Sequence, residues 1–111
     1  MHWIHLNDET QLEQILSKSQ GKPQVIFKHS TRCSISAVAL QRLQRGAQPM
    51  DIDFYFVDLI AYRPISNKIA ELFKVPHESP QILVIRDGKC VYDESHMGIS
   101  MNEIVDHAYA A

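Results

Sequence analysis

The chain has 111 residues, 45% of them hydrophobic, and a formal net charge of −2 at pH 7, so we expect one domain over residues 1–111 with a core of its own. This charge gives no basic surface for nucleic acid, and no apolar run reaches the roughly 18 residues of a membrane span. Because the first residues also lack the pattern of a secretory signal, we expect a cytoplasmic protein without nucleic-acid or membrane partners.

The first two thirds of the sequence alternate between strand and helix patterns. Asp8 and Gln11 form a capping box, and Pro64 suits the first turn of a helix. Apolar spacing and short branched apolar runs define the elements. The predicted order is a strand at 3–6, a helix from 8 to about 19, a strand at 25–27, a helix from about 33 to 46, a strand at 54–57 and a helix from 64 to 73.

The last third predicts a hairpin followed by a helix. Asp87-Gly88 stands between the strand patterns at 81–86 and 89–93 and is a strong signal for a two-residue turn. Ser100 and Glu103 form a capping box for the final helix. The complete order, βαβαβαββα, predicts an α/β fold with a mixed central sheet and helices on both faces.

Cys33 lies where a buried strand gives way to a helix. Unpaired amides and the helix dipole favour an anion at this place, and the cationic neighbours Lys28, His29 and Arg32 would add to the same field. The anion would be the Cys33 thiolate, which attacks disulfides. A buried cysteine that only packs is the alternative, but its position and neighbours favour a reactive thiol in a reducing compartment.

Ser36 stands three residues after Cys33, on the same side of the first helical turn. A hydroxyl can donate a hydrogen bond to a thiolate but cannot form a disulfide. A mixed disulfide at Cys33 would therefore persist until an external thiol attacked it. We predict single-thiol chemistry with Cys33 and Ser36 as the candidate catalytic pair.

Several separated blocks resemble the thioredoxin-like superfamily and, within it, the monothiol bacilliredoxins, including general-stress members with a Thr-Cys-Pro-Ile-Ser motif. The resemblance covers nearly the whole chain, and Ser34 departs from it because the family has proline directly after the nucleophile. The matching blocks are 28–33 with Ser36, 63–67, 77–81 and 95–96.

The resemblance implies a thioredoxin-like fold and an oxidoreductase that reduces mixed disulfides between client proteins and bacillithiol. Bacillithiol would be a co-substrate, with no bound cofactor, and we expect a monomer or weak dimer. The resemblance also implies a cis Ser79-Pro80 bond that holds the Ser79 backbone beside Cys33. The candidate substrate-binding residues are Thr31, Ser34, Ser79, Pro80, His96 and Gly98.

Strand lengths separate the second cysteine from this site. The strand at 81–86 carries the chain roughly 20 Å from Pro80, so Cys90 is expected at the far pole as a packing residue. A two-residue turn returns His96 and Gly98 toward Pro80. Gly98 would let its backbone approach a bound thiol closely.

Other functions remain open on the residues alone. A metal site joining His29, Cys33 and His77 lacks the usual ligand spacing, and we predict no metal. A non-catalytic thioredoxin-like binding module would use the groove beside Pro80 to hold a partner segment. An iron–sulfur carrier is a further alternative, but Ser34-Ile35 replaces the Gly-Phe of such glutaredoxins.

Overall fold

A computed structural model describes residues 1–110 and contains a mixed five-stranded sheet with the strand order β1-β3-β2-β4-β5. No helix within these residues has the length and apolar character needed to cross a membrane. The strands are β1 (Ile4–His5), β2 (Gln24–His29), β3 (Asp53–Asp58), β4 (Gln81–Arg86) and β5 (Lys89–Ser95). The helices are α1 (Thr10–Lys18), α2 (Ser34–Arg45), α3 (Arg63–Phe73), α4 (Met101–Ala108) and the short 3₁₀ helix η1 (His96–Gly98).

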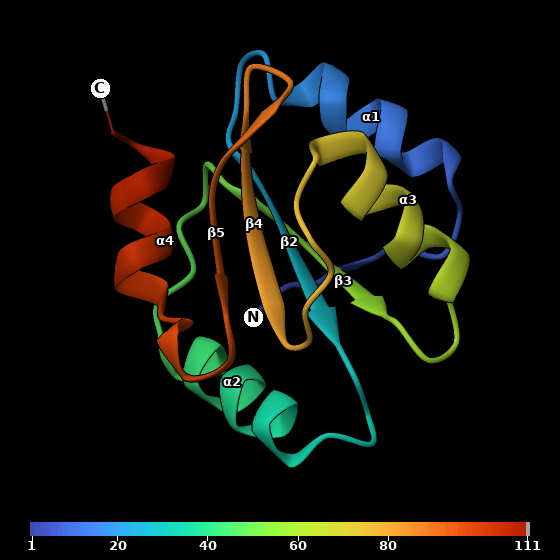
Figure 1. Cartoon of the computed structure of the whole chain (residues 1–111). Coiled ribbons are helices and arrows are strands. Elements are labelled where there is room, and N and C mark those ends of the chain that lie inside the picture. The colour runs from blue at the N-terminus through green and yellow to red at the C-terminus, as the bar shows by residue number, and fades with distance from the viewer. Residues whose placement is uncertain (111) are drawn as a thin grey trace.

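The sheet separates two helical layers, with α1 and α3 on one face and α2 and α4 on the other (Figure 1). Strands β1, β3 and β2 are parallel, whereas β4 and β5 form an antiparallel hairpin that joins the sheet along β2. The predicted order of strands and helices is confirmed, and η1 is the one additional element. Each element begins and ends within a few residues of its predicted bounds.

Alternation along β2 divides the core between the two layers. Ile26 belongs to the cluster beneath α1 and α3, together with Ile15 and Ile69. Val25 and Phe27 belong to the cluster beneath α2 and α4. All six side chains of β2 are buried because both faces of this central strand are covered.

The hairpin has the predicted register, with Arg86 opposite Lys89. Asp87 and Gly88 both have positive φ, at 51° and 75°, as a type I′ turn requires. A bulge follows, because the partner of Val84 is Tyr92 whereas the partner of Ile85 is Cys90. The turn is fixed to the end of α1, where the buried Ser19 accepts hydrogen bonds from the Asp87 and Gly88 amides.

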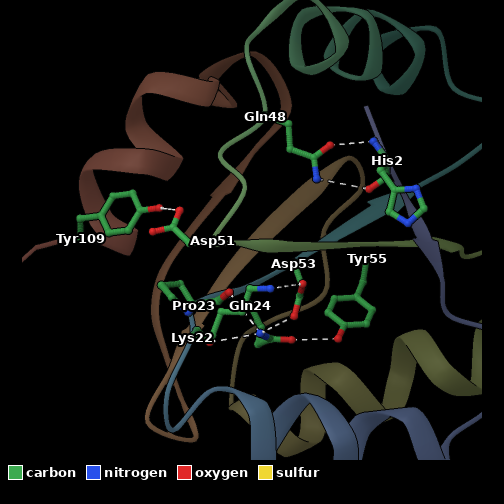
Figure 2. A network of polar contacts seen from close by, with 9 residues as sticks. All are labelled: His2, Lys22, Pro23, Gln24, Gln48, Asp51, Asp53, Tyr55 and Tyr109. Atoms are coloured by element: carbon green, nitrogen blue, oxygen red, sulfur yellow. Dashed lines mark hydrogen bonds and ion pairs between the residues drawn. The ribbon is translucent and has the colours of Figure 1, made fainter.

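Polar groups at the amino ends of β2 and β3 form a network of contacts (Figure 2). The amide of the buried Gln24 donates to Asp53 at 3.0 Å and accepts from the Tyr55 hydroxyl at 2.8 Å. Lys22 pairs with Asp53 at 2.9 Å. These bonds satisfy a polar side chain inside the sheet, at the end opposite to Cys33.

Gly46 marks a close approach between the end of α2 and the start of α4. A Cβ atom here would lie 2.9 Å from Met101 Cβ and 3.1 Å from Met101 Cγ. Gly46→Ala is therefore expected to lower the free energy of unfolding by about 1–3 kcal/mol through overpacking. Urea unfolding measures this, with Gly21→Ala as control because a Cβ at Gly21 meets nothing within 4 Å. Equal midpoints for the two variants would contradict the prediction.

Candidate functional site

Three segments that are distant in sequence meet at the end of the sheet where β2 leads into α2. Lys28 in β2 is opposite Gln81 in β4, and Gln81 is opposite Ser95 in β5. The Ser79-Pro80 bond, directly before β4, is cis, as the resemblance implied. The His96 amide donates to the Pro80 carbonyl at 3.0 Å, so η1 lies beside the proline loop. This register brings the predicted substrate-binding segments to one end of the fold.

Cys33 is the N-cap residue of α2. Its carbonyl accepts the first helical hydrogen bond, from the Ala37 amide at 3.2 Å, and its own amide donates to the Ser30 carbonyl at 3.2 Å. The side chain is partly exposed and forms no disulfide. Because the first amides of a helix lack intrahelical partners, an anionic N-cap side chain can accept from them. The Cys33 side chain makes no such cap hydrogen bond in the structure, so stabilisation of its thiolate by these amides stays a prediction.

Ser34 keeps the backbone geometry that a proline at this position would need. Cys33 has φ −115° and ψ 120°, within the extended region that proline imposes on the residue before it. Residue 34 occupies the first helical position, where proline is readily accommodated. The chain around Cys33 thus follows a path that a proline at position 34 could also adopt, and Ser34 adds one amide donor.

Ser36 is fully buried, and its hydroxyl bonds within the chain. It accepts from the Ser30 amide at 3.0 Å and shares a hydrogen bond of 2.7 Å with His29 Nδ1. These contacts hold the strand exit against the first turn of α2. A hydrogen bond from Ser36 to the Cys33 thiolate stays a prediction, and the contacts in the structure give Ser36 a positioning role.

The cationic neighbours are arranged differently from the expectation. Burial lowers the pKa of His29, and the nearby Asp58 acts in the opposite direction. Because the pKa is lowered, the ring is neutral at neutral pH and adds no full positive charge near Cys33. Lys28 lies on the α3 face of the sheet, where its ammonium contacts Ser66 and His77. Direct action of Lys28 on the thiolate stays a prediction, and the contacts in the structure give its ammonium partners on the α3 face instead. Arg32 and Thr31 are exposed immediately before Cys33.

The far side of the site is formed by the proline loop and η1. His96, with φ 57°, lies 3.7 Å from the Glu78 carboxylate through its Nε2 atom, and both side chains are exposed. A Cβ at Gly98 would lie 2.6 Å from the Glu94 carboxyl carbon, so a larger residue here would require the flexible Glu94 side chain to move. The Ser79 hydroxyl is buried and forms no hydrogen bond. Contacts of Ser79, His96 and Gly98 with substrate stay predictions.

Cys90 lies two residues beyond the hairpin turn, at the opposite end of β4 from Pro80. Its thiol donates to the Tyr92 carbonyl at 3.3 Å, and burial raises its pKa to about 11. The side chain packs against the core beneath α1 and α3, as expected for a packing residue. Cys90 therefore has neither the position nor the thiolate fraction to resolve a disulfide at Cys33.

The positions of the histidine, cysteine and acidic side chains also bear on metal binding. Within residues 1–110 no group of three or more His, Cys, Asp and Glu side chains could hold a metal ion. His29 contacts Ser36 and the aromatic ring of Phe56, whereas His77 contacts Lys28 on the other face. Ser66 and Gln81, which contact Lys28 and the proline loop, lie in the matching blocks 63–67 and 77–81, but nothing in the sequence assigned either residue a role in the site.

Known proteins are similar to this chain at the level of both sequence and fold. A family model described as monothiol bacilliredoxin BrxC matches residues 4–104. A solved structure described as a proposed oxidoreductase with a thioredoxin fold is 30% identical, with a TM-score of 0.82, over 94% of this chain and 91% of the other.

Two thioredoxins show the same fold at lower identity. Fasciola hepatica thioredoxin is 19% identical with a TM-score of 0.74, over 93% of this chain and 97% of the other. Malassezia sympodialis thioredoxin is 16% identical with a TM-score of 0.72, over 97% of both chains. The fold is thus thioredoxin-like, as predicted. The match to the bacilliredoxin family, together with the 30% identical oxidoreductase, supports a thiol-redox function.

Proposed function

Since the chain belongs to the monothiol bacilliredoxin family, we propose that it reduces mixed disulfides between client-protein cysteines and bacillithiol, with Cys33 as the nucleophile. One observation carries the proposal. Cys33 is partly exposed at the start of α2, and the position three residues later holds a serine. The only other cysteine, Cys90, lies at the far end of β4. A disulfide formed at Cys33 must then be resolved by a thiol from outside the chain.

The proposed reaction is a pair of thiol–disulfide exchanges. The Cys33 thiolate attacks the bacillithiol sulfur of the mixed disulfide, so a bond forms between these two sulfurs while the client sulfur leaves as a thiolate and takes up a proton. The client cysteine is reduced and Cys33 is oxidised. A second bacillithiol, as thiolate, then attacks the bacillithiol sulfur on Cys33 and releases the Cys33 thiolate and bacillithiol disulfide.

The surroundings of Cys33 support both steps. The amides at the start of α2 and the exposed Arg32 stabilise the thiolate as attacking group and as leaving group. Thr31 and Ser34 on one side, with Ser79 and His96 on the other, form the proposed contact surface for the mixed disulfide. We place this reaction in the reducing cytoplasm, where an unpaired thiol persists.

Transfer of the small thiol tests the proposal. A model protein with one cysteine is loaded with bacillithiol or, in parallel, with glutathione, and is mixed with the reduced chain. We expect the bacillithiol group to leave the model protein and appear on the chain, at a rate at least about tenfold above the glutathione sample, which corresponds to a difference of about 1.4 kcal/mol in barrier. Mass spectrometry follows both proteins. Equal rates for the two thiols would contradict the proposed preference for bacillithiol. If neither thiol were transferred, the proposed function itself would be contradicted.

A further inference from the structure

Lys28 is a fully buried cation that the exchange reaction does not use. Its Nζ atom lies 3.2 Å from the Ser66 carbonyl oxygen in α3 and 3.3 Å from His77 Nδ1. Burial of the ammonium lowers the pKa of Lys28 to about 8, so the group is still mostly protonated at neutral pH. A buried charge is costly unless good partners compensate it, and an apolar side chain on β2 would avoid this cost.

The protonation state of His77 follows from its two partners. A protonated lysine can only donate, so His77 Nδ1 must accept from Lys28. The Ser66 hydroxyl lies 3.3 Å from the same nitrogen and can donate to it as well. His77 is therefore neutral with its proton on Nε2.

Gln81 fixes the same loop at a second point. It is the register partner of Lys28, so the two side chains lie on the same face of the sheet. Its amide nitrogen donates to the Pro76 carbonyl at 3.0 Å, and its side-chain oxygen is buried without a partner. Together Lys28 and Gln81 hold the segment that runs through Glu78 to the cis Ser79-Pro80 bond.

We propose that Lys28, Ser66, His77 and Gln81 form a loop anchor, in which Lys28 and Gln81 position the proline loop for binding of the mixed disulfide at Cys33. The inference rests on the proposed function. Its physical basis is that one residue serves two parts of the site. The backbone of Lys28 continues through β2 toward Cys33, while its side chain contacts His77 in the segment that leads to the cis Ser79-Pro80 bond.

The loop anchor opens when His77 gains a proton, because Nδ1 then no longer accepts from Lys28. Burial lowers the pKa of His77, and the charges of Lys28 and Arg63 lower it further, whereas Glu78 acts in the opposite direction. With its folded-state pKa below the ordinary value, the stabilising contact is complete above about pH 6.5 and is lost as the pH falls through the lowered pKa. Substrate binding should therefore weaken on the acid side.

Two substitutions test the loop anchor in the full chain. Lys28→Met keeps the length of the side chain and removes its charge and donors, and His77→Asn keeps an acceptor but does not titrate. The exposed Lys68 in α3 provides the matched control Lys68→Met. The substrate is a peptide that carries a mixed disulfide with bacillithiol, reduced in the presence of excess bacillithiol.

We expect Lys28→Met to raise KM roughly tenfold, the effect of losing one charged hydrogen bond, with a smaller change in kcat. The wild-type KM should rise as the pH falls below about 6.5, and His77→Asn should remove this acid dependence. The rate at which iodoacetamide alkylates Cys33 does not depend on a loop contact. In Lys28→Met this rate should differ from that of the wild type by less than about twofold, within the spread of surface substitutions. Lys68→Met should match the wild type.

Amide hydrogen exchange separates the loop anchor from the proposed function. The His96 amide donates to the Pro80 carbonyl and so reports on the loop without any thiol chemistry. In the Lys28→Met protein this amide should exchange its hydrogen faster, while the amides of the core strands should remain as protected from exchange as in the wild type. Unchanged KM and unchanged His96 exchange in a folded Lys28→Met protein would overturn the inference. A wild-type protein that accepts no thiol, but whose His96 exchange responds to Lys28→Met, would overturn the proposed reaction and leave the anchor in place.

Discussion

Cys33→Ser is expected to abolish adduct formation when the reduced protein is incubated with oxidised bacillithiol or oxidised glutathione, whereas the wild type should gain the mass of one small thiol. The effect is complete because the serine hydroxyl is not ionised at neutral pH and cannot attack a disulfide sulfur. Cys90→Ser keeps the adduct, since the Cys90 thiol is held at a pKa of about 11 by burial and lies at the far end of β4. Intact-protein mass spectrometry under non-reducing conditions measures all three proteins.

The same experiment distinguishes an oxidoreductase from a binding module. A module that only holds a partner segment beside Pro80 would bind clients equally well with serine at position 33. An adduct found on Cys33→Ser, or an adduct lost in Cys90→Ser, would show that the reactive sulfur is not the one at the start of α2. A wild-type protein that stays unmodified would contradict the exchange mechanism.

Ser36→Cys is expected to convert the persistent adduct into an internal disulfide. Residues three apart on a regular helix have Cβ atoms about 5–6 Å apart, whereas a disulfide needs roughly 3.5–4.5 Å, so closing the disulfide requires a small backbone adjustment at the non-helical N-cap residue Cys33. The second thiol would attack the mixed disulfide at Cys33 and release the small thiol. The reacted variant should then have the mass of an oxidised dithiol with no added group, while the wild type retains its adduct under the same conditions.

Ser36→Ala is the control for the lost hydroxyl. It removes the hydrogen bonds to Ser30 and His29 but supplies no thiol, so its adduct should persist. Both variants leave the buried Ser30 amide without its partner, and each should lower the free energy of unfolding by about 1–3 kcal/mol. A Ser36→Cys protein that keeps the small thiol would show that this position cannot reach the Cys33 sulfur.

Local sequence signals accounted for most of the fold. Asp87-Gly88 specified its turn because both residues tolerate positive φ, and Ser100 capped α4 through the Glu103 amide as the sequence indicated. The position of Cys33 at the start of α2 was also predictable from local sequence, because an apolar strand followed by a helical pattern locates the junction within a residue or two. The cis Ser79-Pro80 bond came from the family resemblance, because most bonds before proline are trans.

The sequence by itself therefore determined the order of the elements and the place of Cys33 at the start of α2, because each depends on residues that are neighbours along the chain. Only the tertiary structure decided which side chains meet around them. Lys28 stands five residues before Cys33 in the sequence, yet its contacts lie 38 and 49 residues away, at Ser66 and His77. The physical reason is that strand alternation turns Lys28 to the α3 face, and the partners available there are set by packing between distant segments.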